Sequence, residues 1–242
     1  SDVCASDLIW IMRFGRNIIT DGLVLALDAA NKKSYPGSGT SITDMIGNVS
    51  GDLINGPTFD SANNGSIVFD GVNDYISLDR STTYDFTNDD SFTISGWFNT
   101  TQADGSGPYV GKWGTNAAST GGYQLWVGGA TGGNRITFSV ANGGSTSATT
   151  TVMTYTFGIW NFFVGVYHAN TKLECYLNNT GYQTTSYTSA INNPAVNFTI
   201  GKAGYGSQTF TGKSSSVLLY NRALTSTEIL HNYNSTKDRF GL

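Results

Sequence analysis

Several side chains of the sequence carry oxygen atoms that a hard cation such as Ca²⁺ could use. The densest group directly follows the apolar residues 67–69. Calcium binds six to eight oxygens from carboxylates, amides and backbone carbonyls. The same residue types form tight turns, because Asp bonds its own backbone and Gly71 adopts positive φ freely. A structural calcium and a set of turns are both open, and turns are the more common use. The candidate calcium ligands are Asp28, Asp44, Asn48, Asp70, Asn73 and Asp74.

A second group of side chains could contact a sugar. Sugar sites combine an aromatic ring, which packs on apolar C–H groups, with amides and carboxylates that bond the hydroxyls. The segment from residue 109 to residue 116 offers this mixture, and the predicted glycan-binding residues are Tyr109, Trp113 and Asn116. The alternative is that one of the two rings belongs to the core or to the surface of a sheet, as we expect for Trp126.

Hydrolysis of a glycosidic bond would need a pair of carboxyl groups. Retaining enzymes hold them about 5–5.5 Å apart. The sequence has only two glutamates: Glu228 fits a helix cap, and Glu174 stands alone on its predicted strand. A G-x-S-x-G motif, which would mark a serine nucleophile, does not occur. We therefore predict that the protein is not an enzyme, with a glycoside hydrolase as the weaker alternative.

The composition of the 242 residues limits the class of protein. Hydrophobic residues make up 39%, aromatic residues 13% and charged residues only 12%, so the chain can bury a large core. A surface rich in Ser, Thr, Asn and Gly suits an extracellular or virion-surface location. The net charge of -4, without a Lys/Arg cluster, argues against nucleic acid as a partner. The apolar residues 8–12 are too few to span a membrane.

The elements that would position these residues are short strands. Apolar runs separated by Gly- and Asn-rich turns predict an all-β fold, a sandwich of antiparallel sheets. Residues 66–69 and 75–78 predict a hairpin around Asp70-Gly71. The capping box Thr225-Ser-Thr-Glu228 predicts a short C-terminal helix that covers one side of the sandwich. Further strands are predicted at residues 22–27, 91–100, 109–112, 123–127, 135–140, 159–167, 172–177, 198–201 and 213–220.

The first twenty residues differ from the rest. We predict an N-terminal arm over residues 1–20 and one domain over residues 21–242. As a strand, residues 8–14 would be apolar on both faces and would need cover on both. Either this strand lies in the core of its own domain, the more common arrangement, or it adds to the sheet of a neighbouring chain. The assembly residues under the second alternative are Leu8, Trp10 and Met12.

The cysteines leave one choice open. Cys4 and Cys175 could form a disulfide, although two cysteines so far apart in the sequence do not by themselves indicate one. Cys175 alternates with Leu173 and Leu177, and this favours a buried thiol on a strand.

Several segments, in chain order, resemble the laminin-G-like or concanavalin A-like jelly-roll family over roughly residues 20–242. The ending Lys237-Asp-Arg-Phe-Gly-Leu242 and the Tyr35-Pro-Gly loop are similar to a branch found in bacteriophage and aquatic-virus structural proteins. The segments that carry the family resemblance are Asp21-Gly-Leu-Val-Leu-Ala-Leu-Asp-Ala29, Leu53-Ile-Asn-Gly-Pro-Thr-Phe59, Gly65 to Leu78, Phe92-Thr-Ile-Ser-Gly-Trp97 and Tyr220-Asn-Arg-Ala-Leu-Thr-Ser-Thr-Glu-Ile229.

The resemblance implies a jelly-roll fold, binding of glycans or proteins, and often a structural calcium. The sequence departs from the family at Asp44-Met-Ile-Gly-Asn-Val49 and at Lys213-Ser-Ser-Ser216, and both departures weigh against calcium. We predict a non-catalytic carbohydrate-binding or adhesion module that is a structural component of a virion or extracellular assembly. The alternative is a purely structural subunit, such as a decoration, tail or fibre part, without glycan binding. The expected partners are glycans, further copies of the chain or other structural proteins.

Overall fold

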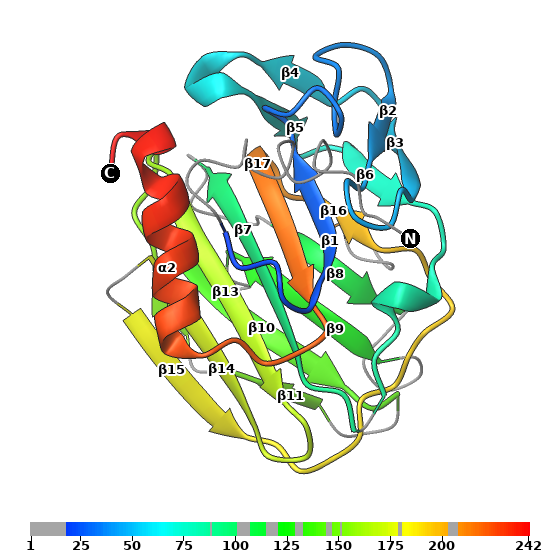
Figure 1. Ribbon diagram of the computed structural model, residues 1–242, viewed down its shortest axis with the longest axis vertical. Coiled ribbons are helices and arrows are strands. Elements are labelled where there is room, and N and C mark those ends of the chain that lie inside the picture. Colours follow the sequence, from blue (N-terminus) through cyan, green and yellow to red (C-terminus); the bar gives the residue numbers. More distant parts are fainter. Residues whose placement is uncertain are drawn as a thin grey trace, which may run out of the picture.

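The computed structural model describes residues 18–242, apart from residues 88, 101–106, 115–120, 129–132, 144–146, 151, 179–180 and 203–207. The described residues form two antiparallel β-sheets that pack face to face, with one α-helix, α2 (Ser226–Thr236), over the outer face of one of them (Figure 1). The prediction of an all-β antiparallel sandwich with a short C-terminal helix is confirmed.

The first sheet, sheet A, carries the helix. Its strand order is β15-β14-β13-β7-β17-β5-β4, and β1 pairs with the second half of β17. The strands are β1 (Leu23–Asp28), β4 (Thr58–Asp60), β5 (Ser66–Asp70), β7 (Phe92–Asn99), β13 (Asn161–His168), β14 (Lys172–Leu177), β15 (Gly181–Ser186) and β17 (Thr211–Tyr220).

The second sheet, sheet B, has the order β11-β10-β9-β8-β16-β6-β3-β2, with β12 paired to β10. Short 3-10 turns, η1 (Ala62–Asn64), η2 (Thr82–Tyr84) and η3 (Lys237–Phe240), complete the described elements. The strands of sheet B are β2 (Ser41–Thr43), β3 (Ser50–Ile54), β6 (Tyr75–Leu78), β8 (Pro108–Trp113), β9 (Gly122–Val127), β10 (Arg135–Ala141), β11 (Ser147–Thr149), β12 (Met153–Thr154) and β16 (Thr199–Ile200).

The predicted hairpin at residues 66–78 is wrong in its pairing. Both strands exist, but β5 pairs with β17 and β4 in sheet A, whereas β6 pairs with β3 and β16 in sheet B. The polar turn therefore carries the chain from one sheet to the other. The carboxylate of Asp74 accepts the backbone N–H of Asp70 at 3.1 Å, so a side chain closes this corner.

The main core lies between the two sheets. Phe92, Ile94 and Phe98 of β7 point into it, as the alternation of that strand predicts, and Phe138 of sheet B packs on Phe92 with ring centroids 6.0 Å apart. Trp97, from the same strand, points to the other side. Strand β7 is consequently buried on both of its faces.

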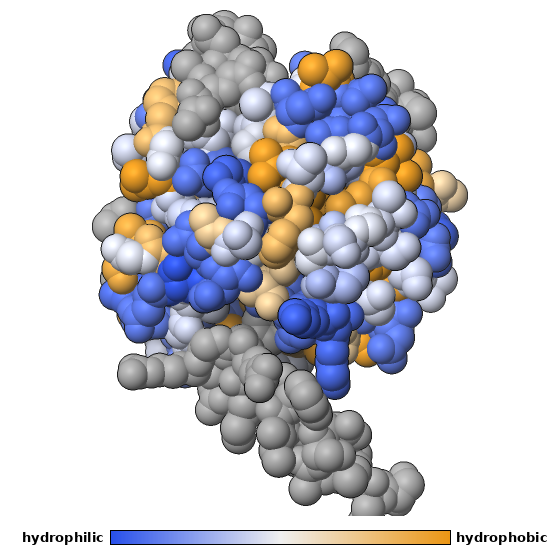
Figure 2. All heavy atoms as spheres, turned by 90° about the horizontal axis from the view of Figure 1, so that it is seen from above, coloured by the Kyte–Doolittle hydropathy of each residue, from blue (hydrophilic) through white to orange (hydrophobic). Residues whose placement is uncertain are grey.

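A second apolar cluster covers the outer face of sheet A. Trp97 packs against Phe162 of β13, Tyr233 of α2 and Phe240 of η3, with ring centroids 5.2, 5.7 and 4.3 Å away. Its indole N–H also donates to the Thr236 hydroxyl at 2.9 Å. These contacts fix the helix on the sheet. On the surface seen from above, hydrophobic residues lie in small groups between hydrophilic ones (Figure 2).

The last residues of the predicted arm contact the body of the domain, and the division of the chain at residue 20 stays a prediction. Ile18 is buried against sheet A, and Ile19 donates its N–H to Asn232 of α2 at 2.8 Å, so these residues pack on the body. The arm residues Leu8, Trp10 and Met12, and also Cys4, lie outside the described residues. Cys175 carries a free buried thiol, whose pKa burial raises to about 11.

Candidate functional site

The aspartate predicted as a calcium ligand at residue 44 closes a turn. Asp44 is fully buried and accepts the N–H groups of Ala26, Ile46 and Gly47 at 2.8, 3.0 and 2.9 Å. The Tyr84 hydroxyl donates to the same carboxylate at 3.0 Å. Four internal donors thus occupy its oxygens. Asn48, nearby in sequence, takes a left-handed backbone conformation with φ of 52°, which is typical of a turn residue.

Asp28 has a different structural partner. Its Oδ1 accepts the Ala30 N–H at 2.9 Å and forms an ion pair with Arg239 of η3 at 2.7 Å. The carboxylate is 5% exposed, so the pair is largely shielded from water. This candidate ligand therefore joins the C-terminal segment to sheet A.

The corner at residues 70–74 keeps its oxygens close together. Asp70 accepts the Val72 N–H at 2.8 Å, which lowers its pKa, whereas burial raises the pKa of Asp74. Oδ1 of Asp74 is buried and has no hydrogen-bond partner in the part of the chain that the structure describes, and Asn73 lies between the two aspartates. No group of three or more His, Cys, Asp or Glu among the described residues could hold a metal ion. The calcium assignment stays a prediction.

Two of the three predicted glycan-binding residues are buried. Tyr109 is fully buried between the sheets, where its hydroxyl donates to the Trp97 carbonyl at 3.0 Å and lies 2.9 Å from the Ser214 hydroxyl. It has no access to a ligand. Trp113 is 5% exposed, and its indole nitrogen has no hydrogen-bond partner among the described residues. Asn116 lies outside the described residues.

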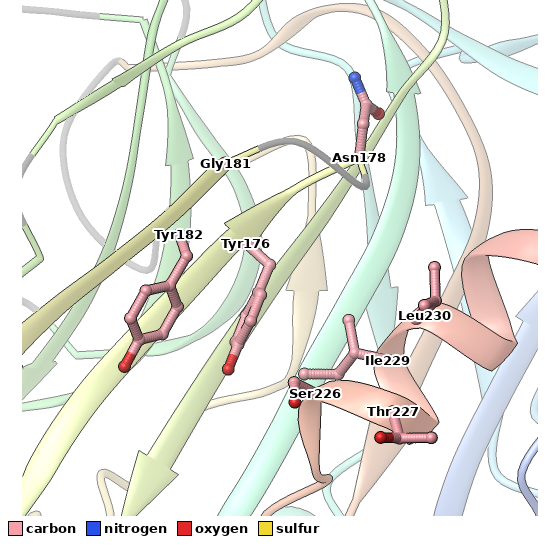
Figure 3. Close-up of a pocket in the computed structure, with 8 residues that line it drawn as sticks. All are labelled: Tyr176, Asn178, Gly181, Tyr182, Ser226, Thr227, Ile229 and Leu230. Carbon is pink, nitrogen blue, oxygen red and sulfur yellow. The ribbon is translucent and has the colours of Figure 1, made fainter.

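The structure instead brings functional groups together on the outer face of sheet A, in a groove beside α2. Two adjoining pockets, of about 310 and about 560 Å³, share Tyr176, Tyr182 and Ser226 (Figure 3). Strands β14 and β15 form one wall and the start of α2 forms the other. The remaining residues that line this groove are His168, Glu174, Asn178, Gly181, Leu224, Thr225, Thr227, Ile229 and Leu230.

Glu174 lies at the centre of the polar part of the groove. Strand alternation points Leu173 and Cys175 into the core and Glu174 outward. The Tyr176 and Tyr182 hydroxyls donate to the two carboxylate oxygens, each at 3.0 Å. Lys172 Nζ lies 2.5 Å from Oε1, and His168 Nε2 lies 3.1 Å from Oε2. A carboxylate that stands alone in the sequence has four partners in the fold.

These partners determine the protonation of the carboxylate. Burial by itself would raise the pKa of Glu174, but hydrogen bonds from Lys172, His168 and Tyr176 outweigh it and lower the pKa to about 2. In return, hydrogen bonding to Glu174 raises the pKa of Lys172. Glu174 is therefore ionised at neutral pH. It is a poor candidate for a general acid, which needs a pKa near the working pH.

The tyrosine pair gives the groove an aromatic surface. Tyr176 and Tyr182 lie directly opposite each other on β14 and β15, with ring centroids 5.0 Å apart. Tyr182 is 48% exposed, and it is the one aromatic side chain of the described residues that is exposed to this degree. Figure 3 shows both rings on the sheet, with Ser226, Thr227, Ile229 and Leu230 of the helix across from them.

This groove was not predicted from the sequence, although the alternation of residues on β14 indicates one of its walls. The alternation that buries Leu173, Cys175 and Leu177 places Lys172, Glu174 and Tyr176 together on the opposite face. Strand β15 has no apolar face to mark it, because its residues alternate only between exposed and half-buried. Its register, which sets Tyr182 against Tyr176, was therefore not predictable.

The sequence profile of the concanavalin A-like lectin/glucanases superfamily matches residues 70–230, which is more than half of the chain. The protein belongs to this family. A search among curated proteins finds no match. In the described part of the chain, no helix is long and apolar enough to cross a membrane.

Solved structures share the fold at low identity. The binding domain of botulinum neurotoxin serotype G superposes with a TM-score of 0.68 at 15% identity, over 87% of this chain and 50% of that one. Domain 4 of AbnA, a GH43 extracellular arabinanase from Geobacillus stearothermophilus, gives 0.66 at 14% identity, over 87% and 98%. Trypanosoma rangeli sialidase gives 0.63 at 17% identity, over 92% and 34%. The chain spans about half the length of the toxin binding domain.

Proposed function

We propose that this chain is a non-catalytic carbohydrate-binding module and that the groove between α2 and strands β14 and β15 binds the sugar. The observation that carries the proposal is the half-exposed ring of Tyr182, which its hydrogen bond to Glu174 holds in place. A ring fixed before binding loses little side-chain entropy when a ligand packs on it. The nearby hydroxyls of Ser226 and Thr227 supply hydrogen-bonding groups.

The structural relatives support a binding role. The AbnA domain was solved in complex with arabinotriose, and the binding domain of botulinum neurotoxin DC in complex with SialylT has a TM-score of 0.69 at 13% identity, over 90% of this chain and 52% of that one. The sialidase is an enzyme, so the fold alone does not decide between binding and hydrolysis. The carboxylate of Glu174 is ionised and already has four close polar neighbours, and this supports binding without hydrolysis.

A glycan array with the intact chain and two variants tests this function. We expect wild type to bind a defined set of glycans and Tyr182→Ala to lose that binding by about tenfold or more, since aromatic contacts carry much of the energy of such sites. Tyr75→Ala, at a half-buried tyrosine on β6 of sheet B, is the control and should bind as wild type does. Absence of glycan binding by wild type would refute the function.

A location on the surface of a virion or another extracellular assembly is the finer form of this proposal. Its support is the sequence of residues 8–14, apolar on both faces and suited to pairing with a neighbouring sheet. Size-exclusion chromatography with light scattering on the full chain and on a variant lacking residues 1–17 tests the assembly role. We expect the full chain to assemble and the shortened one to be monomeric. An unchanged state would contradict this role and leave glycan binding intact.

A further inference from the structure

The groove has room for more than one sugar unit. Its two pockets meet at Tyr176, Tyr182 and Ser226, and one extends toward Asn178 while the other extends toward His168. Each volume, about 310 and about 560 Å³, lies within the range of clefts that hold a small ligand. A ring packed on Tyr182 at the junction leaves space on both sides.

We infer that the groove selects neutral oligosaccharides of two or more units and discriminates against acidic ones. This inference rests on the proposed function, because it specifies the ligand of the same groove. Two observations support it independently of the volumes: the direction of the tyrosine hydrogen bonds and the distribution of charge.

The tyrosine hydroxyls can act toward a ligand only as acceptors. Tyr176 and Tyr182 both donate their protons to Glu174, at 3.0 Å each. A phenol has one proton, so what each oxygen still offers is its lone pairs. The hydroxyl groups of a neutral sugar can donate to them. A carboxylate or sulfate group has no proton to donate and would face these lone pairs unfavourably.

The charges around the groove also disfavour an anion. Glu174 is the one carboxylate among the described lining residues, and its closest cation, Lys172, already lies 2.5 Å from it. A helix N-terminus attracts anions, but Glu228 fills that role at the start of α2, where it accepts the Thr225 N–H at 2.8 Å. Arg222 pairs with Glu228 at 2.7 Å. A second carboxylate would be repelled by Glu174, and among the described lining residues the only side chain that can carry a positive charge, His168, already lies against Glu174.

Titration calorimetry with the full chain tests the inference. The ligands are neutral pentose and hexose oligosaccharides of one to about six units, uronic-acid oligosaccharides of the same lengths, and a sialylated oligosaccharide. We expect affinity to rise by about tenfold or more from one unit to two or three, and acidic ligands to bind about tenfold or more weakly than neutral ones of equal length. Monosaccharides that bind as tightly as oligomers, or acidic sugars that bind as well as neutral ones, would overturn the inference while glycan binding itself stands. Failure of every saccharide to bind would remove the proposed function as well.

Two variants test the acceptor oxygen of Tyr182 and the negative charge of Glu174 separately. Tyr182→Phe keeps the ring and removes the acceptor oxygen, so neutral ligands should bind several-fold more weakly, whereas Tyr75→Phe in sheet B should have no effect. Glu174→Gln removes the negative charge and leaves Lys172 unpaired, so binding of uronic-acid ligands should improve several-fold. Unchanged discrimination in Glu174→Gln would show that this carboxylate does not set the preference.

Discussion

A carboxylate with four close polar neighbours, such as Glu174, fixes the side chains around it. Its oxygens hold two tyrosines, a lysine and a histidine at 2.5 to 3.1 Å. Because the Glu174 side chain is only 7% exposed, its oxygens are shielded from bulk water, which strengthens these interactions. The exposed ring of Tyr182 is then part of a rigid surface.

The pH dependence of stability should show this network. The folded-state pKa of Glu174, about 2, lies below its ordinary value of 4.5. Its contribution is therefore full above about pH 4.5 and is lost as the pH falls toward 2. We expect Glu174→Gln to lower the free energy of unfolding near neutral pH by about 1–3 kcal/mol and the difference from wild type to vanish near pH 2. Melting temperatures between pH 2 and 7 measure this.

The control for this experiment is Asp52→Asn, at an exposed carboxylate on β3. Its melting temperature should follow wild type across the range. A constant difference between Glu174→Gln and wild type at every pH would contradict the assigned role of the charge.

The start of α2 connects the groove to the core. Thr225 accepts the Glu228 N–H at 3.3 Å, and Glu228 accepts the Thr225 N–H at 2.8 Å, which is the capping box that the sequence predicts. The same turn places Ser226 and Thr227 in the groove, while Ile229 is buried against sheet A. Helix capping and the shape of the groove are therefore linked.

Removal of this cap should affect both stability and binding. We expect Thr225→Ala to lower the free energy of unfolding by about 1 kcal/mol, the usual cost of losing an N-cap hydroxyl, and to weaken glycan binding because the helix start frays. Urea denaturation measures the stability. Thr225→Ser keeps the hydroxyl and should behave as wild type. Equal loss in both variants would mean that the methyl group, and not the cap, matters.

Besides the packing of Phe240 on Trp97, an arginine joins the C-terminal turn η3 to the body of the molecule. Arg239 pairs with Asp28 at 2.7 Å and donates to the carbonyls of Asn63 and Gly65, both at 2.6 Å. We expect Arg239→Ala to lower the free energy of unfolding by about 3 kcal/mol, because it leaves the buried Asp28 carboxylate without its partner. Urea denaturation of Arg239→Ala and Asp28→Asn/Arg239→Ala tests this. A double variant no more stable than the single one would refute the explanation.

Across the whole molecule, the distance between the two sheets depends on small residues. Gly165 of β13 faces sheet B, and a Cβ added there would lie 2.6 Å from the Phe138 ring and 2.8 Å from Leu125. Gly96 of β7, on a neighbouring strand, would meet the Tyr109 hydroxyl at 2.6 Å. The rings of the core fill the space that these glycines leave.

Gly165→Ala should therefore destabilise the sandwich. We expect a loss of about 1–3 kcal/mol through overpacking, although alanine suits a strand no worse than glycine. Chemical denaturation measures it, and the companion variant Gly165→Ala/Phe138→Leu, which frees space across the sheets, should recover part of the loss. Wild-type stability of the single variant would mean that the sheets separate without cost.

How far the sequence predicts this molecule depends on the range of the interactions. The capping box, the alternation of β7 and the strands at residues 75–78 and 172–177 are local patterns, and the structure confirms them. The pairing of β5 and β6 was predicted wrongly, because a short polar turn looks the same whether it closes a hairpin or crosses between sheets. The groove joins Glu174 to Tyr182 and to a helix some fifty residues later, and only the fold brings these together.

The position of β17 has a consequence for synthesis. This strand lies in the middle of sheet A, where β7, β5 and β1 all pair with it, yet it is made after all three (Figure 1). Until residues 211–220 have left the ribosome, those earlier strands expose edges that have no partner. Such edges are sites of aggregation. Sheet A can therefore be completed only after β17 has been made, and a nascent chain stalled before β17 would be a target for chaperones.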